Sequence, residues 1–311
     1  MGFTFSVACL LLFVSTSYQL QVKNGTNGYV TYQIGGRRTN VVISAPHGGT
    51  LKPGNLPDRP ENGCYDSAND ECIYQAGCSG DDDVSNCKVL SELGDWNTQH
   101  LAVELADSIQ ARFKGRKKRR PHVVRCELHR SKLDANRDLG EAAFGNAEAA
   151  LAWEEYHGFI DEAKRAVRGN VFYIDVHGHS LHDWNMIGVL LSKSGSNGFN
   201  KAVLPDRLAQ YSSIMQLHVD SGVSMEELVR GNTSIGGFLQ PFYETAPSPV
   251  NKDAGSRAFY SGGYSLRRHT GWKANGIQVE AIYAVRSDET VRKAFADKLA
   301  KAIIYWIKNY L

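Results

Sequence analysis

The chain has 311 residues, of which 42% are hydrophobic, 22% charged and 10% aromatic. This is the composition of a globular protein with enough apolar residues for a full core, and it excludes collagen-like and low-complexity chains. The formal net charge of +2 gives no electrostatic field that would favour nucleic acid as the main partner.

The N-terminus predicts export from the cell. Val7–Val14 (VACLLLFV) is an apolar run too short to span a bilayer, and small residues follow it at Ser15–Ser17. This pattern is typical of a secretory signal peptide over residues 1–17, although no Lys or Arg precedes the run; a buried first strand or helix is the alternative. No later stretch is apolar enough for a membrane helix, so we expect a secreted, extracellular domain over residues 18–311.

Two sequence motifs predict glycosylation. Asn24 and Asn232 each begin an Asn-X-Ser/Thr triplet. Such triplets accept N-linked glycans if the chain enters a eukaryotic secretory pathway.

Most of the cysteines crowd one segment that is rich in Asp, Asn, Gly and Ser: Cys64, Cys72, Cys78 and Cys87. Such a segment cannot form a core of its own, and two local disulfides would stabilise it as a loop insertion over residues 60–90. Four cysteines allow three pairings, and a four-thiolate zinc site is the alternative. We expect the remaining cysteine of the exported chain, Cys126, to be a buried thiol in a strand.

Strand and helix patterns alternate along the rest of the chain. Strands are predicted at residues 29–34, 41–45, 121–128, 171–176, 186–191 and 277–283, and helices at 95–114, 141–167, 204–219 and 288–310. This alternation predicts an α/β fold, a three-layer sandwich in which a mixed, mostly parallel sheet is flanked by helices. In open sheets of this kind, ligands bind beyond the carboxyl ends of the strands.

Polar residues follow two of the predicted strands. His47 follows the strand predicted at residues 41–45 and is itself followed by two glycines. The strand predicted at residues 171–176 delivers Asp175, His177 and His179. Asp95 begins a helix, where its carboxylate either caps the first turn or points into the same cleft. Two imidazoles and one carboxylate are a three-ligand set for catalytic zinc, with one position left open for water. The alternative for each histidine is a hydrogen-bonded residue of the core.

A single carboxylate interrupts the last apolar strand. Burying Glu280 there is costly unless the residue has a function, and a carboxylate near a metal can take a proton from water. Ion pairing with Arg286 or Arg267 is the alternative. The Gly-rich turn before this strand carries Arg268 and His269, and one of these is expected to polarise the amide carbonyl of a substrate, unless the turn is a surface loop.

Four segments occur in one order along the chain: Ser44–Gly49 (SAPHGG), Arg130–Arg137 (RSKLDANR), Ile174–His177 (IDVH), and Gly262–Tyr264 (GGY) together with Ile277–Glu280 (IQVE). Together they resemble the N-formylglutamate amidohydrolase family. The resemblance covers most of the chain between about residues 41 and 286. It implies a zinc hydrolase related to carboxypeptidases and peptidoglycan amidases, in which two histidines and one acidic residue hold the metal and a glutamate in a strand is the catalytic base.

On this resemblance, His47 and His177 are the two histidine ligands and Glu280 is the base. Carboxypeptidases place a glutamate three residues after the first histidine, but position 50 of this chain is a threonine. The peptidoglycan amidases instead place an acidic residue at the start of the next helix, which here is Asp95. Asp58 and Glu127 are the other acidic candidates.

The resemblance also implies a binding site for a substrate carboxylate. Arg137 would hold that carboxylate with two hydrogen bonds, with Asn136 beside it and Arg130 as a second cation. An ion pair of Arg137 with Asp134 or Asp138 is the alternative.

These observations together predict a secreted zinc-dependent amidohydrolase. Its substrate would be an N-acyl amino acid or a peptide-like molecule that bears a carboxylate. The alternative is a secreted or extracellular-matrix binding protein that keeps the hydrolase fold without turnover. A serine hydrolase is disfavoured, because Gly262–Tyr264 does not have the pattern of a nucleophile elbow.

Overall fold

The computed structural model describes residues 20–59, 64–74 and 93–311. The predicted signal peptide and the cysteines at positions 78 and 87 lie outside the described residues. No helix in the described part of the chain combines the length and the apolar character needed to cross a membrane.

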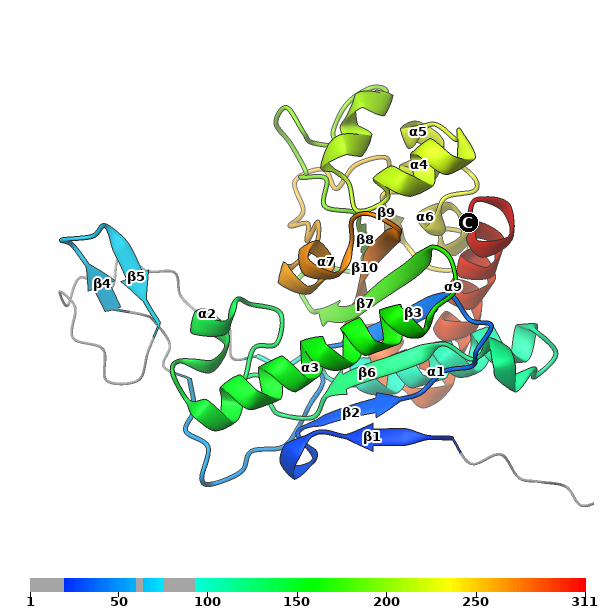
Figure 1. Ribbon diagram of the computed structural model, residues 1–311. Helices are drawn as coiled ribbons and strands as arrows, with labels where there is room; N and C mark the ends of the chain where they lie inside the picture. Colours follow the sequence, from blue (N-terminus) through cyan, green and yellow to red (C-terminus); the bar gives the residue numbers. More distant parts are fainter. Residues whose placement is uncertain (1–19, 60–63, 75–92) are drawn as a thin grey trace, which may run out of the picture.

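One mixed sheet forms the centre of the described chain (Figure 1). In spatial order its eight strands are β1 (Val22–Asn24), β2 (Val30–Gln33), β6 (His122–Cys126), β3 (Val41–Ala45), β7 (Val171–His179), β10 (Ala274–Ile282), β8 (Asn185–Gly188) and β9 (Thr245–Ala246). The central strands β6, β3, β7 and β10 are parallel, whereas β1, β2 and β8 run antiparallel to their inner neighbours. This confirms the predicted α/β fold with a mixed, mostly parallel sheet.

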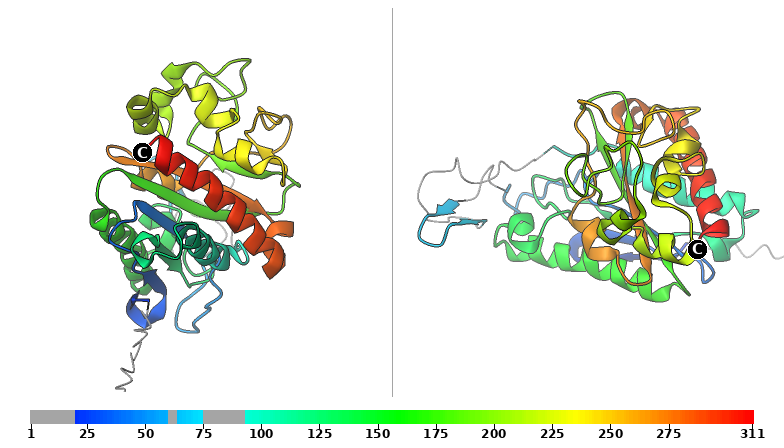
Figure 2. Two further views of the ribbon diagram at one scale, coloured as in Figure 1. Left: turned by 90° about the vertical axis from the view of Figure 1, so that its right-hand side faces the viewer. Right: turned by 90° about the horizontal axis from the view of Figure 1, so that it is seen from above.

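Helices cover both faces of this sheet, as Figures 1 and 2 show from three directions. The longest are α1 (Thr98–Arg112), α3 (Ala147–Ala166) and α9 (Glu289–Asn309). Val41 and Ile43 of β3 pack in one apolar cluster with α1 and α9, whereas Val42 packs in the other cluster with α3. Successive side chains of a strand point to opposite faces, so a central strand with both faces covered is apolar throughout.

The shorter helices lie mostly in the second half of the chain: α2 (Leu139–Ala143), α4 (Met215–Ser221), α5 (Met225–Arg230), α6 (Ile235–Leu239), α7 (Tyr264–His269) and α8 (Tyr283–Ser287). Two predicted helices are interrupted. The helix predicted at 141–167 divides at Phe144 and Gly145, which both have positive φ, and Asn146 caps the start of α3. The helix predicted at 204–219 is a short 3-10 helix at Asp206–Tyr211 followed by α4.

The described part of the predicted insertion is a two-stranded hairpin that projects from the body of the molecule (Figures 1 and 2). Its strands are β4 (Cys64–Asp66) and β5 (Glu71–Ile73). Cys64 and Cys72 are each disulfide-bonded. Cys126 is a buried free thiol in β6, as expected.

Both predicted glycosylation sites are accessible. Asn24 is exposed at the end of the edge strand β1, and Asn232 is exposed between α5 and α6. Attachment of glycans at these positions stays a prediction.

Candidate functional site

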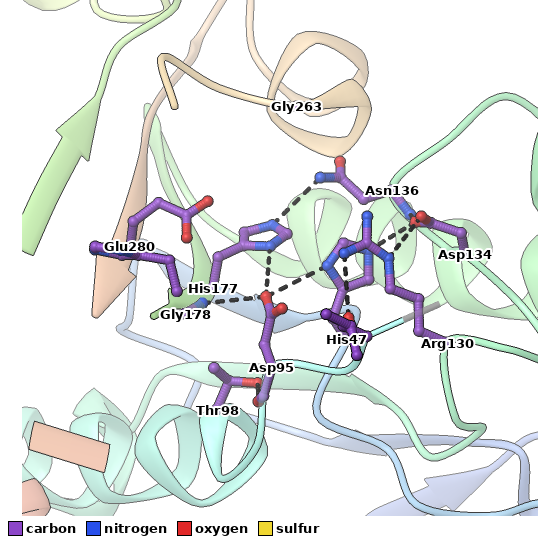
Figure 3. A network of polar contacts seen from close by, with 12 residues as sticks. His47, Asp95, Thr98, Arg130, Asp134, Asn136, His177, Gly178, Gly263 and Glu280 are labelled. Carbon is purple, nitrogen blue, oxygen red and sulfur yellow. Dashed lines mark hydrogen bonds and ion pairs between the residues drawn. The ribbon is translucent and has the colours of Figure 1, made fainter. Parts of the chain in front are cut away.

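Side chains from four segments meet at the carboxyl ends of the central strands (Figure 3). His47 follows β3, His177 lies near the end of β7, and Glu280 lies in β10 directly beside His177 in the strand register. Asp95 enters from the loop that precedes α1. All four line a cleft of about 640 Å³. The structure therefore brings these four sequence-predicted residues together in one cleft.

Three of these residues present their metal-binding atoms to a common point. Asp95 Oδ2 lies 3.4 Å from His47 Nδ1 and 3.2 Å from His177 Nδ1. One ligand atom from each residue lies within 4.8 Å of the others, and all three side chains are buried. Tetrahedral coordination with metal–ligand bonds of about 2.1 Å separates ligand atoms by about 3.4 Å. The set therefore fits one small divalent cation.

The outer nitrogens of both imidazoles contact buried carboxylates. His47 Nε2 lies 2.6 Å from Asp134 Oδ1, and His177 Nε2 lies 2.9 Å from Asp175 Oδ2. Because an ionised carboxylate accepts but does not donate, each Nε2 carries a proton, which makes Nδ1 the nitrogen that a cation would bind once the ring is neutral. Metal-ligating histidines characteristically donate their second N–H to such a partner.

The sequence analysis did not predict that Asp134 and Asp175 would accept hydrogen bonds from the two histidines. Asp175 had a signal in the sequence, since residues two apart on a strand share a face and Asp175 precedes His177 by two. Asp134 had none, because it lies far from His47 in the chain and reaches it only through the fold. Burial by itself would lower the pKa of His177, but Asp175 and Asp95 hold that pKa well above its usual value in the metal-free protein.

Backbone contacts aim Asp95 into the site. Its N–H donates to the His47 carbonyl at 2.9 Å, its carbonyl accepts from Thr98 Oγ1 at 2.8 Å, and its Oδ2 accepts from the Gly178 N–H at 3.1 Å. The residue at the cap position of α1 is Asn97, so Asp95 is not the helix cap. Burial would raise the pKa of Asp95, yet the two histidines hold it well below its usual range.

The two other acidic candidates face elsewhere. Asp58 pairs with Lys132 at 3.1 Å, and Glu127 pairs with Arg125 at 3.1 Å. Neither lines the cleft. Of the three acidic residues considered, Asp95 alone reaches the two histidines.

Glu280 is buried beside the three candidate ligands and points toward them (Figure 3). Its Oε1 accepts a hydrogen bond from Gln278 Nε2 at 2.8 Å. Burial raises its pKa to about 8, with the negative charges of Asp95 and Asp175 acting in the same direction. Among the described ion pairs, none joins Glu280 to an arginine, so the alternative considered from the sequence, pairing with Arg286 or Arg267, is not formed.

The arginines predicted to bind substrate line the cleft on the side of Asp134. Arg130 Nε donates to Asp134 Oδ2 at 2.8 Å, and Arg137 Nε donates to Glu141 Oε1 at 2.7 Å. The ion-pair partner of Arg137 is thus Glu141, not either of the aspartates considered from the sequence. Asn136 Nδ2 lies 3.4 Å from His177 Nε2. Asn136, Arg130 and Arg137 all line the cleft.

Arg268 does not line the cleft, in contrast to its predicted role. Its guanidinium lies 5.1 Å from the ring centre of Trp153, whereas its neighbour Arg267 is among the cleft-lining residues. The reason is that the turn continues into α7, and consecutive helical residues point about 100° apart. His269 is fully buried, with Nε2 2.8 Å from His157 Nδ1, and does not line the cleft either.

No family model matches the sequence, and no curated protein matches it. Several solved structures are similar in fold. N-formylglutamate amidohydrolase from Ralstonia eutropha JMP134 has a TM-score of 0.48 at 11% identity, covering 90% of this chain and 97% of its own. A metallo-carboxypeptidase from Burkholderia cenocepacia has a TM-score of 0.38 at 11% identity, with 94% and 66% covered. Succinylglutamate desuccinylase from Chromobacterium violaceum has a TM-score of 0.35 at 10% identity, with 93% and 70% covered.

Proposed function

We propose that this protein is a secreted, zinc-dependent amidohydrolase whose substrate carries a carboxylate next to the amide that is cleaved. The observation that carries the proposal is the convergence of His47 Nδ1, His177 Nδ1 and Asp95 Oδ2. One atom of each of these three buried residues could bind the same divalent cation, which would take the place of the protons that the imidazoles share with Asp95 in the metal-free protein. The apolar run at residues 7–14 supports export.

The donor set suits zinc. Two imidazole nitrogens and one carboxylate oxygen are ligands of catalytic zinc, and the partners of the two histidines keep both rings in the tautomer that a metal needs. A zinc ion bound there would polarise the amide carbonyl and lower the pKa of a nearby water to about 7. His47, Asp95 and His177 would hold it.

Glu280 is suited to carry the proton. A buried carboxyl whose pKa is about 8 without the metal will ionise more readily beside a divalent cation, and so approaches the neutral range in which a general base works best. It would accept the proton of the attacking water and deliver it to the leaving nitrogen. Gln278 fixes the carboxyl through the hydrogen bond to Oε1.

The guanidinium groups on one part of the cleft lining support a substrate carboxylate. Arg137 has an ion-pair partner in Glu141, but its side chain remains 26% exposed in the cleft. Arg130 and Arg267 add two more guanidinium groups to the same lining. A guanidinium binds a carboxylate with two parallel hydrogen bonds. N-acyl amino acids and peptide termini have such a carboxylate beside an amide.

The test is turnover of a panel of N-acyl amino acids by the zinc-loaded protein. Glu280→Gln keeps the size and the hydrogen bond to Gln278 but accepts no proton, so kcat should fall by at least about 100-fold. An unchanged kcat would remove Glu280 from the mechanism. Binding of the panel without turnover would support the non-catalytic alternative.

A second comparison tests the carboxylate site. Arg137→Met should lower kcat/KM by about 10- to 100-fold, because a charge-assisted hydrogen bond to substrate is lost. Arg268→Met is the matched control and should leave kcat/KM unchanged, since Arg268 lies over Trp153. The Arg137→Met penalty should vanish for substrates whose carboxylate is replaced by a carboxamide. A penalty of the same size for both substrates would contradict the assignment.

A further inference from the structure

One buried arginine contacts three segments of the site. Arg286 lies in the last turn of α8 and is 3% exposed. Its Nε donates to the Ala281 carbonyl at 2.9 Å, its Nη2 donates to the His179 carbonyl at 3.2 Å, and its Nη1 donates to the Trp96 carbonyl. Each nitrogen of the guanidinium is thus bonded to a different part of the chain.

Each of the three carbonyls belongs to a residue that follows a residue of the proposed site by one or two positions. Trp96 follows Asp95, and Ala281 follows Glu280. The third carbonyl, that of His179, lies two residues after His177. We infer that Arg286 is a positioning residue, whose guanidinium holds the backbones of the acidic ligand, the second histidine ligand and the general base at the spacing that zinc binding requires. The inference rests on the metal site proposed above.

Gly178 supplies an independent observation. A Cβ at this position would overlap the guanidinium group of Arg286 at Nε and Cζ. The backbone of Gly178 is ordinary strand, so the position needs glycine for space and not for conformation. Its N–H also donates to Asp95 Oδ2 at 3.1 Å. The guanidinium therefore packs directly on the backbone that joins His177 to Asp95.

Two further hydrogen bonds fix the backbone of Arg286. Its own carbonyl accepts from Asn97 Nδ2 at 3.0 Å and from Arg292 Nη1 at 3.0 Å. Arg292 in turn forms a two-bonded ion pair with Glu104 of α1, at 2.8 and 2.9 Å. Helices α1 and α9 thus anchor the residue that contacts the site.

A planar fork of donors explains why the residue is arginine. The guanidinium offers five N–H groups in fixed directions, whereas a lysine ammonium is a compact point charge that cannot reach three separated carbonyls. No carboxylate in the described part of the chain forms an ion pair with Arg286. Its partners are backbone carbonyls, which is what a positioning role predicts.

The test measures zinc affinity by competition with a chromogenic chelator, together with the melting temperature of the metal-free protein. Arg286→Lys should weaken zinc binding by about 10- to 100-fold, the range typical of residues that orient metal ligands. Arg230→Lys is the control: Arg230 is 1% exposed and donates to four backbone carbonyls of residues that do not line the cleft, besides its ion pair with Glu226. It should lower the melting temperature and leave zinc affinity unchanged.

Gly178→Ala is a second route to the same change, because the added methyl displaces the guanidinium while the arginine stays in the chain. It should weaken zinc binding as Arg286→Lys does. If Arg286→Lys does not fold, Gly178→Ala still tests the positioning role of Arg286. Gly54→Ala, at a glycine with no atoms near its Cβ position, should change nothing.

Two results would overturn the inference, and they are distinguishable. If the Arg286 and Gly178 variants lose melting temperature but keep the zinc affinity of the wild type, Arg286 supports only the fold and the proposed function stands. If the wild type binds zinc no more tightly than His47→Ala, the proposed metal site fails, and the role of Arg286 fails with it.

Discussion

At the scale of single residues, buried charge explains how the site is organised. Asp134 is surrounded by groups that keep it ionised: burial would raise its pKa, but His47 and Arg130 hold that pKa well below its usual range. Its Oδ1 accepts from His47 Nε2 and from the Asn136 N–H at 3.0 Å. An ionised, fully bonded Asp134 keeps the His47 ring in one orientation and one tautomer.

Replacing this carboxylate should therefore weaken the metal site without touching a proposed ligand. Asp134→Asn keeps the size of the side chain but removes its charge, and we expect zinc affinity to fall by about 10- to 100-fold. Asp58→Asn is the control, because Asp58 bonds Ser131 and Lys132 outside the cleft. Zinc titration of both variants against a competing chelator measures the difference. Equal affinities would mean that Asp134 does not tune the metal site.

At the scale of elements, periodicity located the long helices and the central strands. The 20 residues of α3 and the 21 of α9 span enough turns for a repeat of 3.6 residues to be visible. Helices α5, α6 and α7 have 6, 5 and 6 residues, less than two turns each, so no such repeat can be read from them. The break at Phe144 was hidden for another reason: a bulky residue with positive φ is rare, and only the following glycine marked the turn.

The sequence likewise predicts only part of the candidate site. His47, His177 and Glu280 could be predicted because each ends or interrupts an apolar strand, and parallel strands bring their carboxyl ends to one edge. Asp134 and Arg286 could not, since their contacts join segments that only the folded sheet and helices bring together. Arg268 was predicted in the cleft because the rotation of α7 is not visible in a Gly-rich turn of sequence.

The contact between β2 and β6 predicts acid sensitivity away from the site. His122 Nδ1 accepts from the Gly35 N–H at 3.1 Å and from the Tyr32 hydroxyl at 2.8 Å, and burial lowers the pKa of His122 to about 4. The unfolded chain takes up this proton near pH 6.5. The contribution to stability is therefore complete above pH 6.5 and is lost as the pH falls toward 4, by up to about 1.4 kcal/mol per pH unit.

Urea unfolding at pH 7 and pH 5 measures this effect. His122→Gln offers an acceptor that does not titrate, so its free energy of unfolding should fall less between the two pH values than that of the wild type. The other histidines are common to both proteins and cancel in the comparison. A loss of the same size in both proteins would show that His122 is not the source of the acid sensitivity.

At the scale of the whole molecule, the proposed metal site joins regions that pack separately. Two apolar clusters lie on opposite faces of the sheet, and the site lies where β3, β7 and β10 end between them. Asp95 connects the start of α1 to this edge through its contacts with His47 and Gly178. A cation bound to all three candidate ligands would tie these segments together and would bind the folded chain but not the unfolded one.

Zinc should therefore stabilise the protein by mass action. At a free zinc concentration about 100 times Kd, the free energy of unfolding should rise by about 2.7 kcal/mol, and the melting temperature by several degrees. Chelation should reverse the rise. The double variant His47→Ala/His177→Ala lacks the two imidazoles that face Asp95. Zinc should therefore no longer shift the melting curve of this variant. A zinc-dependent rise that survives in this variant would place the stabilising ion elsewhere on the molecule, and calorimetry of both proteins with and without zinc separates the two outcomes.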